Sequence, residues 1–154
     1  MALRIGDQAP DFRLPGAGVS HFNLHRDMAG KIFILYFYPK NFTPGCTAEA
    51  CSFRDHFDEF RDLDVEVIGI STDSVESHEK FRSKYKLPFI TLADTDGGVS
   101  TLYGAKIPFL NMSKRKSFLI DNQMRIAGIY ENFFDGNAHI VAMIQRIREN
   151  AKLQ

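Results

Sequence analysis

The stretch Ile32–Cys51, "IFILYFYPKNFTPGCTAEAC", contains a strand, a loop and the start of a helix in one continuous run. Its first part, Ile32–Tyr38, is uninterrupted apolar and aromatic sequence, which is typical of a strand buried on both faces. Thr43 and Pro44 then supply an N-cap followed by proline at the first helical position, so a helix is predicted to begin there. Only a short loop, beginning at Pro39, separates the strand from the helix.

Strands and helices alternate on both sides of this stretch. The helix that begins at Pro44 is predicted to run to about Leu63, with apolar or aromatic residues at positions 50, 53, 57, 60 and 63. A second helix, for which Asp73 and Glu76 have the spacing of a capping box, is expected to run to about Tyr85. Further strands are expected at "DFRL" (11–14), "HFNL" (21–24), "VEVIGIS" (65–71), "PFITLAD" (88–94), "SFLID" (117–121) and "RIAGIY" (125–130), and further helices at "GVSTLYG" (98–104) and residues 137–153. This order predicts an α/β fold whose mixed central sheet has helices on both faces.

Length and charge limit the classes of protein to which the chain can belong. Its 154 residues, with 44% apolar content, fit one globular domain spanning residues 1–154. Nineteen basic and nineteen acidic side chains balance, so no general electric field favours nucleic acid or an anionic membrane as a partner. The longest apolar run, Ile32–Tyr38, is far shorter than the roughly 20 residues of a membrane helix, and "MALRIGDQAP" (1–10) lacks the apolar core of a secretory leader. A soluble, cytoplasmic protein is expected.

Cys46 and Cys51 are the only cysteines of the chain, and both fall on the predicted helix. In a reducing compartment such a pair more often indicates reactivity or a metal than a structural bridge, while two inert buried thiols are the simplest alternative. Cys46 would lie on the first turn, where unpaired backbone N–H groups and the positive end of the helix dipole favour an anion. Because the thiolate is the nucleophilic form of cysteine, this position favours reactivity.

Cys51 lies five residues further along the helix, on a different face. At about 100° and about 1.5 Å per residue, the two Cα atoms would be about 8.7 Å apart. A disulfide requires no more than about 6.8 Å between Cα atoms, so the two sulfurs cannot bond while the helix is intact. A redox cycle that uses both cysteines therefore requires the first turns of the helix to unwind, and a helix end can open at low free-energy cost.

Oxidation of Cys46 by a peroxide would give a sulfenic acid, with which a second thiol can condense to form a disulfide and water. Within the chain, Cys51 is the only residue that can supply that thiol. The leaving oxygen develops negative charge, so the site also needs fixed donors such as helix N–H groups, a hydroxyl and a cation. Thr43, three residues before Cys46, supplies the hydroxyl.

The stretch "YPKNFTPGCTAEAC" (38–51) resembles the peroxidatic motif of the peroxiredoxins, with Pro39, Thr43 and Cys46 in the spacing of that family. The five-residue gap to Cys51 is similar to that of the bacterioferritin comigratory protein branch, also called the Q type, with an atypical two-cysteine cycle. The resemblance runs from "GDQAPDF" (6–12) through "FRDHFDEF" (53–60) and "VIGISTDS" (67–74) to "RKSFLID" (115–121), so it covers nearly the whole chain.

This resemblance implies a thioredoxin-like fold and a peroxidase that reduces hydrogen peroxide and alkyl hydroperoxides. It makes Cys46 the peroxidatic cysteine and Cys51 the resolving one, joined in an intramolecular disulfide that thioredoxin or a similar dithiol reduces. Thr43 would hydrogen-bond the thiolate and the peroxide. Pro39 would shield the pocket, and Arg115 would hold the thiolate and polarise the O–O bond.

Glu49 matches a glutamate of the same branch in the pattern "C-T-x-E". Because an acid one turn from Cys46 would by itself oppose a thiolate, Glu49 is expected to pair with a cation, either Arg115 or Arg54.

The residues around these positions carry weaker expectations. Asn41 and Phe42 stand where many relatives are more acidic or polar, and an aromatic ring at the mouth of the pocket would favour bulkier hydroperoxides. Lys114 and Lys116 are expected at the surface of a solvated turn. Because the resemblance is to a branch with more monomers than decamers, a monomer is expected, with a weak dimer as the alternative.

The same residues bear on other possible functions and partners. Two cysteines and five scattered histidines are too few or too dispersed for an iron–sulfur cluster or a structural zinc site, so no metal or cofactor is implied. A general thiol–disulfide oxidoreductase is one alternative, although the C-x-x-C spacing of such enzymes is absent. A redox-controlled chaperone or binding protein, which exposes an apolar helix face on unwinding, is another.

Overall fold

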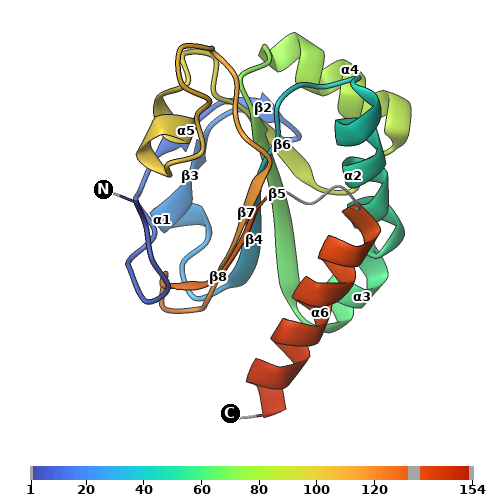
Figure 1. The fold of residues 1–154 in the computed structure, drawn as a ribbon. Coiled ribbons are helices and arrows are strands. Elements are labelled where there is room, and N and C mark those ends of the chain that lie inside the picture. Colours follow the sequence, from blue (N-terminus) through green and yellow to red (C-terminus); the bar gives the residue numbers. More distant parts are fainter. Residues whose placement is uncertain (1, 132–135, 153–154) are drawn as a thin grey trace.

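The computed structural model describes residues 2–131 and 136–152, and its centre is a six-stranded mixed sheet (Figure 1). The order across the sheet is β2-β6-β5-β4-β7-β8, in which β4, β5 and β6 are parallel and the other pairs are antiparallel. The strands are β2 (Gly16–Ala17), β4 (Ile32–Phe37), β5 (Val65–Ser71), β6 (Ile90–Ala93), β7 (Lys116–Ile120) and β8 (Ile126–Glu131). A separate antiparallel pair joins β1 (Arg13–Leu14) to β3 (Phe22–Asn23).

Helices cover both faces of the sheet (Figure 1). One face carries α1 (Leu24–Asp27) and α5 (Gly98–Leu102), and the other carries α2 (Pro44–Asp55), α3 (Phe57–Asp62), α4 (Val75–Tyr85) and α6 (Gly136–Lys152). The predicted α/β fold with a mixed, doubly covered sheet is therefore confirmed. In the part of the chain that the structure describes, no helix is long and apolar enough to cross a lipid bilayer. One domain over residues 1–154 stays a prediction, which the shared sheet supports.

The strand β4 lies at the centre of the sheet. This central position explains why its own sequence is so apolar. It pairs with β5 on one side and with β7 on the other. Phe33, Leu35 and Phe37 enter the core beneath α1 and α5, whereas Ile34 and Tyr36 enter the core beneath α2 and α6. Successive side chains of a strand point to opposite faces, so a strand covered on both sides has no polar face.

The carboxyl ends of the parallel strands lie at the same end of the sheet. The segments that follow these strands carry the polar residues of the site. Tyr38, directly after β4, donates its amide to the carbonyl of Ile70 at 3.1 Å. Asp94, directly after β6, donates its amide to the carbonyl of Ser71 at 2.8 Å. The carboxyl edge of parallel strands is where open α/β sheets usually place their sites, and here it leads directly into α2.

The single helix predicted from Pro44 to Leu63 is wrong, because α2 and α3 are separate helices joined at His56. His56 has φ −97° and ψ 8°, which lies in the bridge region between helical and extended conformations. Phe53 of α2 and Phe60 of α3 are both fully buried, with ring centroids 6.0 Å apart. The apolar spacing thus continues across the break, so the sequence pattern contains no sign of it.

The start of α4 also differs from the prediction. Ser74 is the N-cap, and its hydroxyl accepts a hydrogen bond from the amide of Ser77 at 3.1 Å. The predicted capping box of Asp73 and Glu76 is wrong, because the carboxylate of Asp73 points back and accepts from the amide of Asn41 at 2.8 Å.

Candidate active site

Cys46 lies on the first turn of α2 and is only 2% exposed. Thr43 occupies the N-cap position, and Pro44 follows it in the first turn, as the sequence predicted. The hydroxyl of Thr43 makes no cap hydrogen bond and donates instead to the carbonyl of Lys40 at 2.8 Å. Because Thr43 does not cap the helix, the first-turn N–H groups of Gly45 and Cys46 are left to serve an anion.

The guanidinium of Arg115 joins Cys46 to Glu49. Its Nη2 donates to the Sγ of Cys46 at 3.3 Å, and its Nη1 donates to the Oε1 of Glu49 at 2.6 Å. The Glu49 side chain is 3% exposed and that of Arg115 is 22% exposed. Arg115 comes directly before β7, so a residue 69 positions from Cys46 in the sequence reaches it through the pairing of β7 with β4.

The thiol of Cys46 and the carboxyl group of Glu49 both contact the guanidinium of Arg115 in a buried site. Burial raises the pKa of Glu49 to about 7, although the charge and hydrogen bond of Arg115 act in the opposite direction. Burial disfavours the charge of Arg115, but Glu49 and Cys46 outweigh that effect and raise the pKa of the guanidinium. Arg115 is therefore a fixed cation, whereas Glu49 can gain or lose a proton near neutral pH.

Gly45 allows the guanidinium to approach the helix. A Cβ at this position would lie 3.1 Å from the Nη2 of Arg115, closer than ordinary contact. A larger residue would therefore push away the nitrogen that donates to Cys46.

Cys51 lies on the same unbroken helix as Cys46, and both thiols are free. Its exposure is intermediate, whereas Cys46 is buried. Because the two cysteines are five positions apart on one α-helix, their Cα atoms are about 8.7 Å apart, beyond the reach of a disulfide. The structure therefore shows the wound, reduced arrangement.

Asn41 ties the loop between β4 and α2 to two other elements. Its amide donates to Asp73 at 2.8 Å, and its Nδ2 donates to the hydroxyl of Ser77 at 3.1 Å. The hydroxyl of Tyr38 donates to the Oδ1 of Asn41 at 2.6 Å. Asn41 is 3% exposed, so these hydrogen bonds lie away from solvent.

His78 closes the same network, which the sequence patterns do not predict. Its Nε2 lies 3.0 Å from the hydroxyl of Ser71, which donates to Asp73 at 2.6 Å, and its Nδ1 lies 3.3 Å from the hydroxyl of Tyr38. Burial lowers the pKa of His78 to about 4, against the opposing charge of Asp73, so the ring is neutral. We call Tyr38, Asn41, Ser71, Asp73, Ser77 and His78 the loop network. The available signal was that Ser71 ends β5 and Asp73 follows it closely, at the end of the sheet where β4 also ends.

Phe42 turns toward α4. It is 45% exposed and has φ +67°, with its ring edge-on to Phe81 at 5.2 Å between centroids. The ammonium of Lys84 lies 5.8 Å from its ring centroid. The ring thus holds the loop on α4, and a preference for bulkier hydroperoxides stays a prediction.

The remaining predicted residues are distributed around this centre. Pro39 is half-buried directly after Tyr38. Arg54 does not pair with Glu49 and donates to the carbonyl of Tyr85 at 2.8 Å. Lys116 was expected at the surface, which is wrong: its side chain is 8% exposed and pairs with Glu131 at 2.8 Å. It points to the other side of β7 from its neighbours, as alternation along a strand requires.

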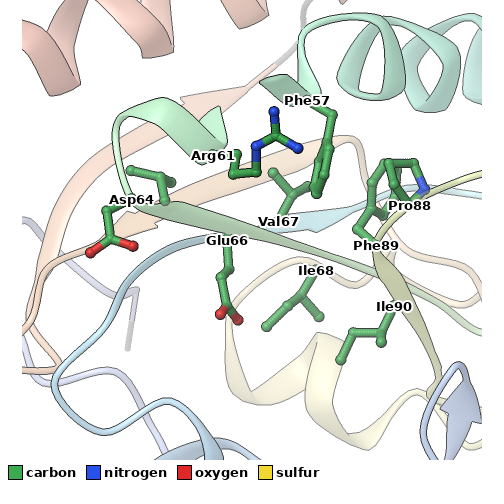
Figure 2. A pocket seen from close by; sticks show the side chains of 10 residues that line it. Phe57, Arg61, Asp64, Glu66, Val67, Ile68, Pro88, Phe89 and Ile90 are labelled. Carbon is green, nitrogen blue, oxygen red and sulfur yellow. The ribbon is translucent and has the colours of Figure 1, made fainter. Parts of the chain in front are cut away.

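A pocket of about 340 Å³ lies at the opposite end of the strands, where β5 and β6 begin (Figure 2). Figure 2 shows Arg61 beside Phe57 on one side of β5, while Glu66 extends to the other side. Glu66 pairs there with Lys31. Because its charged groups diverge, this pocket lacks the convergent polar groups of a catalytic site. Among the residues that the structure describes, no group of three or more histidines, cysteines or acids could hold a metal ion.

The sheet, its helices and a cysteine at a helix N-terminus beside an arginine define a thiol-based enzyme with a thioredoxin-like fold. The family model of the AhpC/TSA family matches residues 5–129. The putative peroxiredoxin bcp of Coxiella burnetii is 40% identical over 96% of this chain and 100% of its own length. The chain therefore belongs to the AhpC/TSA family, as a peroxiredoxin of the Bcp and Q-type branch, and is a thiol peroxidase.

Solved structures agree with this assignment. Peroxidoxin BcpB of Mycobacterium tuberculosis is 32% identical, with a TM-score of 0.88 over 96% of this chain and 97% of that chain. A bacterioferritin comigratory protein of Xanthomonas campestris, whose alkyl peroxide reduction was studied, is 26% identical, with a TM-score of 0.82 over 91% of this chain and 92% of that chain. The resemblance stated from the sequence, including the thioredoxin-like fold, is confirmed.

Proposed function

We propose that this peroxidase reduces hydrogen peroxide and alkyl hydroperoxides by direct attack of Cys46. The thiolate sulfur forms a bond to one peroxide oxygen, the O–O bond breaks, and its electron pair goes to the leaving oxygen. Sulfur is oxidised by two electrons to sulfenic acid, and the peroxide is reduced to an alcohol or water. The alkyl peroxide reduction studied in the Xanthomonas campestris relative supports the substrate class.

The observation that carries this proposal is the hydrogen bond of 3.3 Å from Arg115 to the sulfur of Cys46. A cation and helix N–H groups around one buried sulfur favour its thiolate and stabilise charge on the leaving oxygen. Thr43 would donate to the thiolate or the peroxide after turning its hydroxyl away from Lys40, and Pro39 would limit access of water to the pocket.

Cys51 is the resolving residue in this proposal. Its thiol condenses with the Cys46 sulfenic acid, forming an S–S bond and releasing water. The separation along α2 means that the helix must unwind for this step. Thioredoxin or a similar dithiol then reduces the disulfide by exchange and becomes oxidised itself. A monomer in the cytoplasm, where such reductants are found, completes the proposal.

Mass spectrometry after one equivalent of hydrogen peroxide tests both roles. Wild type should lose two hydrogens without gaining oxygen, whereas Cys51→Ser should gain one oxygen and fail to cycle with thioredoxin. Cys46→Ser should show neither change, and Ser52→Ala serves as a control on the same helix. Peroxide consumption that survives in Cys46→Ser would overturn the peroxidatic role. Thioredoxin-linked turnover of Cys51→Ser at the wild-type rate would overturn the resolving role.

A further inference from the structure

We propose that Glu49 donates the proton that the leaving oxygen of the peroxide takes up, which makes it a further catalytic residue. Arg115 then exchanges one anionic partner, the Cys46 thiolate, for another, the Glu49 carboxylate. This inference rests on the proposed reduction of peroxides by Cys46.

The guanidinium of Arg115 contacts both Cys46 and Glu49, so the three side chains form one continuous series of contacts. Glu49 follows Cys46 by three residues on α2, so both side chains lie on the same side of the helix. The two η nitrogens of Arg115 separate them, one at 2.6 Å from the carboxylate oxygen and the other at 3.3 Å from the sulfur. A peroxide attacked by the sulfur would have its leaving oxygen beside the same guanidinium.

Charge balance limits how many anions this place can hold. With Cys46 and Glu49 both ionised, a single cation would face two negative charges in a buried site, and unpaired buried charge is costly. One anion is therefore favoured at a time. The pKa of Glu49, raised by burial to about 7, agrees with a carboxyl that holds its proton while the thiolate is present.

Other titratable groups around α2 do not replace Glu49. Burial raises the pKa of both Tyr36, on β4, and Tyr38, directly after β4, well above their ordinary value, so these hydroxyls are poor proton donors. From α6, Arg146 donates to the carbonyl of Ala127, and Arg148 pairs with Glu59. The other ionisable groups on α2 are Cys51, Arg54 and Asp55, and the last two pair with each other.

The proposed step is balanced. The Cys46 thiolate, a protonated Glu49 and a hydroperoxide give the Cys46 sulfenic acid, a Glu49 carboxylate and an alcohol. The attacked oxygen keeps its hydrogen and bonds to sulfur, while the leaving oxygen takes the electron pair of the O–O bond and the proton of Glu49. The site carries one anion opposite Arg115 before and after the step.

The variant Glu49→Gln tests the step, because its amide keeps an acceptor for Arg115 but cannot donate a carboxyl proton. Two peroxides are compared in single turnovers by rapid-quench mass spectrometry. With tert-butyl hydroperoxide, whose alkoxide must be protonated, oxidation of Cys46 should slow by about 10²-fold. With peracetic acid, whose leaving acetate needs no proton, it should slow by less than about threefold.

The same preparation of protein is used with both peroxides, so a folding defect would slow the two reactions equally. Equal slowing, or none with either peroxide, overturns the proton role and leaves the peroxidase proposal intact. Failure of wild type to react with either peroxide would instead overturn the peroxidase proposal. Glu76→Gln, the same change at an exposed glutamate of α4, is the matched control and should react as wild type.

An infrared difference spectrum gives a readout independent of rate. Oxidation of Cys51→Ser to the sulfenic acid should replace a protonated carboxyl band by a carboxylate band. The same change should be missing when Glu49→Gln is added. A carboxyl band that does not change on oxidation would overturn the exchange of partners at Arg115.

Discussion

The two halves of the segment around Thr43 are held in opposite ways. Residues 38–42 are fixed by the loop network, in which a neutral His78 and the buried Asn41 join β4 to β5 and α4. Residues 45–49 are held by Arg115, which lies directly before β7, through one hydrogen bond to the carboxyl group of Glu49 and one to the sulfur of Cys46. The first half depends on groups that the reaction does not change, whereas the second depends on the charge of the reacting atom.

Residues 38–42 are therefore the fixed half of this segment, and residues 45–49 are the half that can move. In the proposed reaction, conversion of the Cys46 thiolate to a neutral sulfenic acid would weaken its interaction with Arg115 and leave the loop network unchanged. The helix can then open from its first turn, while the loop that precedes it keeps its place. In the proposed cycle, reactivity and movement are thus joined at one atom, the sulfur of Cys46.

The largest expected effect comes from removing the cation. Arg115→Met should lower the second-order rate constant of Cys46 oxidation by hydrogen peroxide by about 10³-fold, because the leaving oxygen and the thiolate both lose a charged donor. Lys114→Met, at the exposed neighbour, is the control. A loss smaller than about tenfold would show that helix N–H groups alone stabilise the charge.

Oxidation should affect the two halves differently in hydrogen exchange. In the disulfide form the amides of residues 46–51 should lose protection, because the sulfurs cannot join across an intact helix. The amide of Asn41, bonded to Asp73, should keep its protection. Equal loss in both halves would contradict the division, and full protection of residues 46–51 in the disulfide form would contradict the unwinding.

The pH dependence of stability should have opposite signs in the two halves. Glu49 holds its proton more tightly when folded, so its contribution is full below about pH 4.5 and is lost as the pH rises through about 7. His78 binds a proton less readily when folded, so its contribution is lost as the pH falls from about 6.5 through about 4.

Between about pH 5 and about pH 8, the unfolding free energy of Glu49→Gln should therefore rise relative to wild type by up to about 3 kcal/mol. Between about pH 7 and about pH 4, that of His78→Gln should also rise relative to wild type. Urea unfolding at each pH measures both. If the two differences in unfolding free energy from wild type changed with pH in the same direction, the result would contradict the opposite effects of folding on proton binding by Glu49 and His78.

The smallest effect is expected within the loop network. Tyr38→Phe removes a hydroxyl that contacts Asn41 and His78, and should lower the free energy of unfolding by about 1–2 kcal/mol. Its rate of reaction with peroxide should stay close to that of wild type. Tyr85→Phe, at a half-buried tyrosine of α4, is the control. A rate loss comparable to that of Arg115→Met would show that the fixed half takes part in the chemistry.

Local patterns predicted the parts of the fold that depend on nearby residues. The strand Val65–Ser71, the helix start after Thr43 and the short helix before Gly104 follow from apolar runs, capping and glycine. The proximity of Arg115 to Cys46 came only through the family resemblance, since nothing in residues 113–117 alone distinguishes it from its lysine neighbours.

What the sequence did not show depends on contacts between distant segments. The burial of Lys116 is explained by Glu131 on the adjacent strand, and the loop network joins residues more than thirty positions apart. Asp73 has the spacing of a capping residue, but its partner is the amide of Asn41, which no helix pattern contains. Such pairings become visible only when the register of the sheet is known.

The interruption at His56 limits the segment that would open in the proposed cycle. Because the hydrogen-bonded turns of α2 end there, loss of order that starts at Cys46 meets a boundary before it reaches α3. Phe60 and the rest of that short helix can stay packed on β5 while the preceding turns rearrange. Each turn of the proposed cycle would then cost the melting of about three helical turns rather than of a whole layer of the core.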